Sequence, residues 1–178
     1  MTAARLGAAF VAAAAAWAVL LVAVPFLASR AHASPPASAL ILGVYAFGSL
    51  VCHQLPERSF HLWTAQMPVC ARCAGIYFGA VAGAVAGRFR TAALMRPYDP
   101  DVAQGVVPAR AGSVAQGSSP AWRVRITLAI AVAPSLATLV YEWATGTMPS
   151  HTIRAAAGIP IGLVVAWLAV TAAENQVN

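Results

Sequence analysis

Long uncharged apolar stretches alternate with short polar segments along this chain. The first stretch runs from Arg5 to Arg30 without an intervening charge, which is enough for one membrane crossing at about 20 residues per helix. The full pattern predicts helices over about 6–29, 36–52, 68–87, 122–143 and 153–173. We therefore expect an all-α fold, a polytopic integral membrane bundle of about five transmembrane helices that forms a single membrane domain over 1–178.

Polar residues dominate the segment 88–121, which is rich in Pro, Gly, Ser and Gln and carries several arginines. This composition is typical of a flexible loop. Arginine-rich loops usually stay in the cytoplasm, so we expect a cytoplasmic loop here, the N-terminus outside and the C-terminus in the cytoplasm. An alternative treats the first apolar stretch as a cleaved signal peptide ending at Ala31-His32-Ala33, which would reverse the orientation of the remaining helices.

Composition supports the membrane assignment. The chain is 60% hydrophobic and 9% charged, whereas a soluble domain has roughly one quarter charged residues, so it has too few charges to cover a water-facing surface. The net charge of +6 comes from arginine alone. These arginines lie singly or in pairs at the ends of apolar stretches, where they anchor helices at the membrane surface. We expect the lipid bilayer as a partner and no nucleic acid.

Glycines recur every four residues in the third apolar stretch, at positions 75, 79, 83 and 87. Such a row lets a second helix approach closely. Gly158 and Gly162 offer a matching groove in the fifth stretch. The third and fifth helices are therefore predicted to touch, and the sequence is also compatible with a homo-oligomer.

All three cysteines of the chain lie within the short segment 51–79. Cys52 and His53 end the second apolar stretch, and Cys70 and Cys73 form a C-x-x-C pair at the start of the third. Thiolate and imidazole are the donors that zinc prefers. We predict that these four residues bind zinc or another transition metal ion, although His61 is an alternative to His53 as the fourth ligand.

The predicted third helix places Cys70, Cys73 and Tyr77 on the side opposite its glycines. A helix N-terminus favours thiolate over thiol at this position. We expect a polar shell around the ligands that includes Arg58, Arg72, Tyr77, His151 and Arg154. Glu142 is a candidate catalytic general base, which would act on a metal-bound water if one coordination position stays open.

Two other classes of function are consistent with the same residues. A membrane thiol-disulfide oxidoreductase would use Cys70 as the attacking thiolate, Cys73 to resolve the mixed disulfide and Cys52 as a shuttle, although three cysteines leave one unmatched. A scaffold or small-solute permease would use the cysteines only to hold a loop. Nothing in the sequence resembles a nucleotide-binding loop or a Ser/His/Asp arrangement, so the substrate and any enzymatic activity stay open.

Two blocks of the chain resemble a known family. "CHQLPERSF" followed by "QMPVCARCAGIYFG" closely resembles the signature of small predicted membrane proteins of bacteria and archaea, the domain of unknown function 2085. A weaker second block spans 134–162, where Glu142 and His151 stand in place of the family's Asp and Asn. The resemblance implies a multi-pass protein of a bacterial or archaeal plasma membrane with a cysteine-rich patch on its outer face, and it implies no particular activity.

Overall fold

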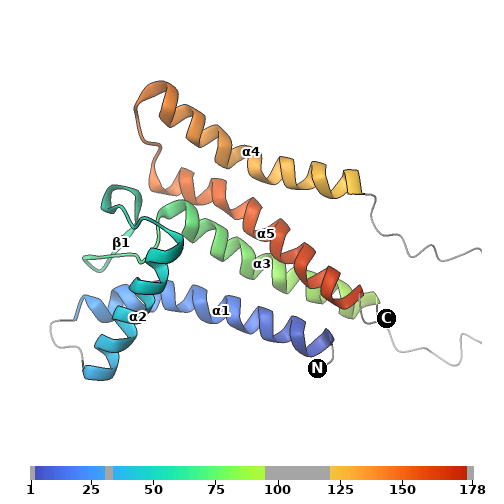
Figure 1. The fold of residues 1–178 in the computed structure, drawn as a ribbon, viewed down its shortest axis with the longest axis horizontal. Helices are drawn as coiled ribbons and strands as arrows, with labels where there is room; N and C mark the ends of the chain where they lie inside the picture. Colours follow the sequence, from blue (N-terminus) through green and yellow to red (C-terminus); the bar gives the residue numbers. More distant parts are fainter. Residues whose placement is uncertain (1–2, 31–33, 95–120, 176–178) are drawn as a thin grey trace, which may run out of the picture.

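The computed structural model describes residues 3–30, 34–94 and 121–175, and this part of the chain folds into five α-helices and one small hairpin (Figure 1). The helices are α1 Ala3–Ala28, α2 Pro35–Val51, α3 Ala71–Leu94, α4 Ala121–Thr145 and α5 His151–Asn175. The connection between α2 and α3 contains a 3₁₀ turn, Pro56–Arg58, and two antiparallel strands, β1 His61–Leu62 and β2 Ala65–Gln66. The all-α class is confirmed, and the hairpin is an addition that the hydropathy pattern did not indicate.

Helices α3 and α5 form the centre of the fold and run parallel to each other. A Cβ atom on Gly75 would lie 1.9 Å from the carbonyl oxygen of Ala155, and one on Gly83 would lie 2.0 Å from that of Leu163. Only glycine permits such a close approach of two helix backbones. The constant offset between the paired positions makes the helices parallel, and the predicted contact between the third and fifth helices is confirmed.

Helix α1 runs antiparallel to α3. Its beginning lies beside the end of α5, because Phe10 and Val170 line the same apolar pocket. Farther along, the Trp17 ring contacts the Tyr77 ring of α3 with centroids 5.9 Å apart. At the end of α1, Phe26 contacts Trp63 of the hairpin that precedes α3.

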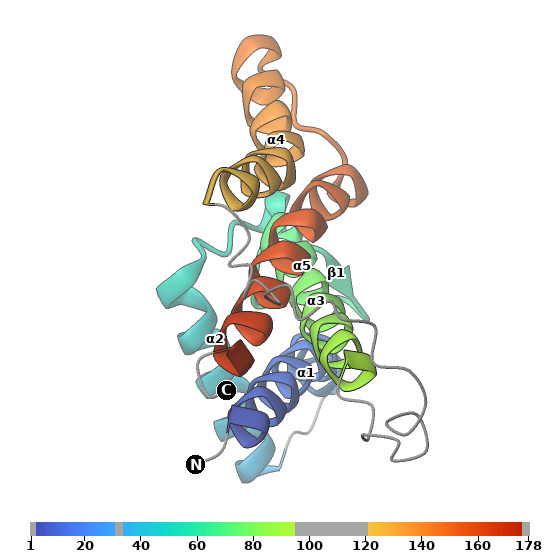
Figure 2. The same cartoon turned by 90° about the vertical axis from the view of Figure 1, so that its right-hand side faces the viewer.

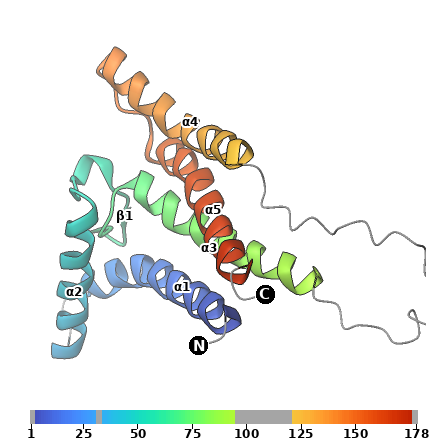
Figure 3. The ribbon, with the colours of Figure 1, turned by 45° about the vertical axis from the view of Figure 1, so that its right-hand side comes forward.

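Helix α2 lies across one end of the other helices (Figures 1 and 3). Its 17 residues extend about 26 Å at 1.5 Å per residue, which is shorter than a hydrocarbon core of roughly 30 Å. Three helices in the described residues are long and apolar enough to cross a membrane, namely 5–28, 121–145 and 151–173. Helix α2, the predicted crossing over 36–52, is shorter than these three helices.

The two ends of the described chain lie at the same end of the helix assembly (Figures 1 and 2). The reason is the crosswise α2, which leaves α1 antiparallel to α3, whereas the sequence predicts termini on opposite faces of a membrane. Helix α3 also continues to Leu94, so residues 88–94 are helical rather than part of a loop. The remainder of the predicted loop, 95–120, and the predicted cleavage site at 31–33 lie outside the described residues.

Helix α4 packs on α5, on the side away from α1 (Figure 2). The hydroxyl of Ser135 donates a 2.8 Å hydrogen bond to the carbonyl oxygen of Ala157. Both residues are buried. This bond joins the two helices at a depth where an unpaired hydroxyl would be costly.

Candidate metal centre

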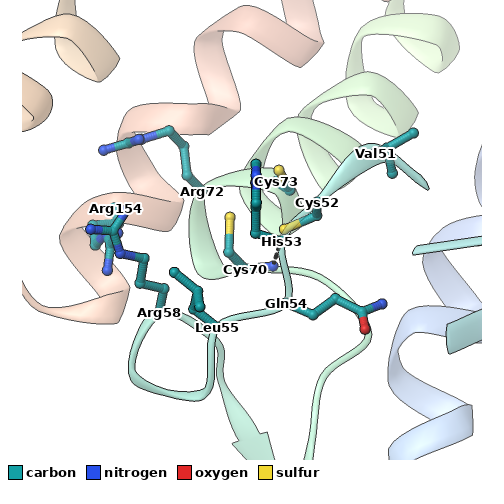
Figure 4. Close-up of a pocket in the computed structure, with 10 residues that line it drawn as sticks. All are labelled: Val51, Cys52, His53, Gln54, Leu55, Arg58, Cys70, Arg72, Cys73 and Arg154. Atoms are coloured by element: carbon teal, nitrogen blue, oxygen red, sulfur yellow. Dashed lines mark hydrogen bonds between the residues drawn. The ribbon is translucent and has the colours of Figure 1, made fainter. Parts of the chain in front are cut away.

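The three cysteines meet where α2 ends and α3 begins. Cys52 is the C-terminal cap of α2, Cys70 directly precedes α3, and Cys73 lies in the first turn of α3. Their sulfur atoms lie within 4.8 Å of one another, and all three are free thiols. The predicted convergence of the lone cysteine with the C-x-x-C pair is therefore present in the structure (Figure 4).

A glutamine holds the connection between α2 and α3 in place. Gln54 adopts the left-handed region with φ of 50°, and its side-chain amide donates 2.8 Å hydrogen bonds to the carbonyl oxygens of Tyr45 and Pro68. Gln66 in turn donates from its side chain to the carbonyl oxygen of Gln54, and Tyr45 Oη donates to the carbonyl oxygen of Gln66. These bonds bring residues on both sides of the hairpin together and so set the distance between Cys52 and α3.

Gly48 allows α2 to approach this connection. A Cβ atom at Gly48 would lie 2.3 Å from the carbonyl oxygen of Pro68 and 2.7 Å from the side-chain nitrogen of Gln54. The sequence prediction missed this glycine and the two glutamines. Gln54 and Gln66 stand inside the two quoted motifs, but an uncharged amide side chain gives no sign in the sequence of which distant carbonyl it will meet.

Hydrogen bonds connect the three thiols, and one of them stabilises negative charge on Cys70. The backbone N–H of Cys70 donates to Sγ of Cys52 over 3.2 Å. The pKa of Cys70 is lowered to about 5, chiefly because the Cys73 thiol donates a hydrogen bond to it, and this effect exceeds the opposing effect of burial. An arrangement that favours thiolate also favours a bound metal cation, because thiolate is the form that coordinates.

His53 occupies a different place from the one predicted. Its side chain is exposed and lines the same pocket as the thiols, but its ring nitrogens lie outside the 4.8 Å group that the three sulfurs form. The structure therefore brings together three of the four predicted ligands, and His53 lines the pocket beside them.

Three arginines share this pocket, whose volume is about 340 Å³. Figure 4 shows the side chains of Arg58, Arg72 and Arg154 on one side of the cysteines. Arg58 Nη2 lies 2.6 Å from Glu142 Oε1, and Arg154 Nη2 lies 3.7 Å from Glu142 Oε2. Arg72 Nη2 instead donates a 3.0 Å hydrogen bond to the hydroxyl of Thr138, a residue that the sequence analysis did not single out.

The remaining predicted residues lie around this pocket rather than in its lining. Glu142, the predicted general base, has both carboxylate oxygens directed at guanidinium groups. His151 Nε2 lies 3.1 Å from the carbonyl oxygen of Glu57, and its ring lies 5.6 Å from that of Phe60, so it ties the 3₁₀ turn to the start of α5. Tyr77 packs against the cluster that contains Cys52.

The fold and the site together define a helical membrane protein with a cluster of free thiols and arginines at one end of its bundle. The chain belongs to the family of predicted membrane proteins called DUF2085, whose model matches residues 52–168. That range begins at Cys52 and extends beyond Arg154, so the family match includes all three cysteines and all three arginines of the pocket.

Two curated archaeal proteins are similar to part of this chain. An uncharacterized protein of Methanocaldococcus jannaschii is 52% identical over 42 residues, which are 24% of this chain and 27% of that protein. An uncharacterized protein of Methanothermobacter thermautotrophicus is 53% identical over 30 residues, which are 17% of this chain and 27% of that protein. The chain thus spans about a quarter of the length of these relatives. No solved structure matches it.

Proposed function

We propose that this chain is a membrane protein that binds zinc or another thiophilic transition metal through Cys52, Cys70 and Cys73. The observation that supports it most directly is the approach of three free sulfur atoms to within 4.8 Å of one another. An ion held at about 2.3 Å from each sulfur needs separations of about 3.8 Å, so a small closing movement would complete the coordination. The amide of Cys70 that donates to Cys52 Sγ holds this sulfur beside the C-x-x-C pair.

The fourth coordination position faces the pocket in this proposal. His53 lines that pocket, so it can supply a nitrogen ligand, or a water or substrate can take the position. Structural zinc sites have four protein ligands, whereas catalytic sites keep one position open. We assign no general-base role to Glu142, because its carboxylate is neutralised by Arg58 and Arg154.

We further propose four membrane crossings, by α1, α3, α4 and α5, with α2 lying along the outer surface and the whole chain forming one membrane domain. Both termini and the connection between α3 and α4 would then be cytoplasmic, and the thiol cluster would face outward. The inner side would carry seven arginines, Arg5 and the six from 88 to 125, against Arg30, Arg58, Arg72 and Arg154 outside. This asymmetry agrees with the positive-inside rule.

Elemental analysis tests the metal proposal. The full-length protein, purified in a nonionic detergent, is expected to hold about one metal ion per chain. A variant in which all three cysteines are serine is expected to hold none, and His53→Ala measured beside it reports whether the histidine is a ligand. Equal metal content in the native protein and the triple variant would contradict the proposal.

A thiol-disulfide oxidoreductase is the second candidate, because Cys70 and Cys73 are partly exposed to the same pocket. Cys70 would attack a substrate disulfide, and Cys73 would then displace the substrate, so that the protein dithiol becomes a disulfide and the substrate gains two thiols. Alkylation with a mass tag distinguishes the two functions. Thiols that are protected until a chelator is added indicate metal, whereas thiols that are protected until a reductant is added indicate redox chemistry.

A further inference from the structure

The pocket beside the thiols carries excess positive charge. Three guanidinium groups line it, and the carboxylate of Glu142 is the acidic group paired with them. These groups leave a formal charge of +2. A divalent metal with three thiolates would contribute about −1, so the loaded pocket stays positive.

The arginines are also not saturated by the protein. The Nε atoms of Arg58, Arg72 and Arg154 are buried without a hydrogen-bond partner among the described residues. Arg154 is 2% exposed, and a buried N–H without a partner is destabilising. Glu142 Oε2 and Trp17 Nε1 are also buried without a hydrogen-bond partner in the described part of the chain, but the three arginine donors share one pocket, and this clustering favours a ligand with acceptor oxygens.

Two helix N-termini add to this field. Because α3 and α5 run parallel, both begin at the pocket, with Arg72 in the first turn of one and Arg154 in the first turn of the other. The partial positive charge at a helix N-terminus favours anions. The two helix dipoles therefore act in the same direction as the arginines.

We propose that this pocket binds the phosphate group of a substrate next to the thiol centre. The inference deepens the proposed function and rests on it, since it assigns a ligand class to the same pocket. Three separate guanidinium groups suit a tetrahedral dianion, whereas a planar monoanionic carboxylate is satisfied by a single guanidinium fork. A volume of about 340 Å³ is large enough for a small phosphorylated molecule or a lipid headgroup.

Calorimetric titration of the metal-loaded, detergent-purified full chain tests this proposal, with inorganic phosphate and a short-chain phosphatidate as separate probes. Saturable binding of either probe is expected, and acetate is expected to bind about tenfold or more weakly. Binding of inorganic phosphate indicates a soluble phosphorylated substrate, while binding of the phosphatidate alone indicates a lipid headgroup. Failure of both probes to bind would overturn the proposal.

The variants Arg72→Gln and Arg123→Gln form a matched pair. Arg72 lines the pocket and donates to the neutral hydroxyl of Thr138, whereas Arg123 is exposed at the far end of α4, over the Trp122 ring. Arg72→Gln is expected to weaken phosphate binding about tenfold or more, whereas Arg123→Gln is expected to leave it unchanged. Arg72→Lys, which keeps the positive charge, is expected to retain part of the affinity. Equal binding by all variants would refute the assignment.

Metal content measured on the same samples separates this proposal from the metal proposal. If metal is present and phosphate does not bind, the anion site alone is wrong. If the triple cysteine variant still binds phosphate and the native protein holds no metal, the metal proposal alone is wrong.

Discussion

Cys70 donates its backbone N–H to Sγ of Cys52 over 3.2 Å, although the two residues are 18 positions apart. This bond links the end of α2 to the start of α3. It directs a donor at the sulfur of Cys52, the one cysteine of the cluster that is not part of the C-x-x-C pair. Its length depends on the path of the connection between them. Gln54 holds that path through the carbonyl oxygens of Tyr45 and Pro68.

Gln54→Ala is therefore expected to weaken metal binding without removing a ligand. Outer residues that orient metal ligands typically contribute about 10- to 100-fold in affinity, and competition with a chelator of known affinity measures the change. Ser49→Ala is the matched control, because Ser49 is exposed on α2 and donates only to the carbonyl oxygen of Ala46. Unchanged affinity in the Gln54 variant would show that the Gln54 side chain does not position Cys52.

Glu142→Gln is expected to destabilise the protein. Glu142 faces both Arg58 and Arg154, and removal of its charge leaves Arg154 buried without an ionic partner, which costs roughly 3–5 kcal/mol. Thermal unfolding at a fixed scan rate in one detergent measures the loss. Glu57→Gln is the control, because Glu57 is exposed and such surface changes stay within about 0.5 kcal/mol. Equal midpoints for the two variants would contradict a structural role for the Glu142 carboxylate.

Local spacing in the sequence was sufficient to predict some long-range contacts. The four-residue glycine period predicted the contact of α3 with α5, because this spacing places every glycine on one face of a helix. The C-x-x-C pair and Cys52 were predicted to meet because few side chains other than metal ligands cluster in this way. Both predictions depended on residues whose chemistry or size leaves few alternatives.

Other features could not be predicted from local patterns. An apolar stretch the length of α2 fits either a short crossing or a helix lying across the bundle, and only tertiary packing decides between them. The pairing of Arg58 with Glu142 joins positions 84 apart, and that of Arg72 with Thr138 joins positions 66 apart. Arginine at a helix end carries no information about which distant acceptor it will meet.

Gly83→Val is expected to disrupt the packing of α3 on α5. A Cβ atom at Gly83 would lie 2.0 Å from the carbonyl oxygen of Leu163, so the two backbones must separate. Overpacking of this kind typically costs about 1–3 kcal/mol, which thermal unfolding in detergent can measure.

Gly43→Val provides the comparison for this variant, because a Cβ atom at Gly43 would meet nothing within 4 Å. A single exposed substitution in a helix is expected to change stability by less than about 1 kcal/mol. If both valine variants unfold at the same temperature as the native protein, the backbones of α3 and α5 do not approach each other closely at Gly83.

The orientation of α1 distinguishes four membrane crossings from five. If α2 does not cross, the segment after α1 lies outside, whereas a five-helix arrangement with an external N-terminus places it in the cytoplasm. Fusions truncated after Arg30 are therefore expected to give active alkaline phosphatase, which folds only outside, and no fluorescence from green fluorescent protein, which folds in the cytoplasm. Fusions after Asn178 are expected to give the reverse result. Because both arrangements place the C-terminus inside, the second fusion controls for expression, and fluorescence after Arg30 would show that α2 crosses the membrane after all.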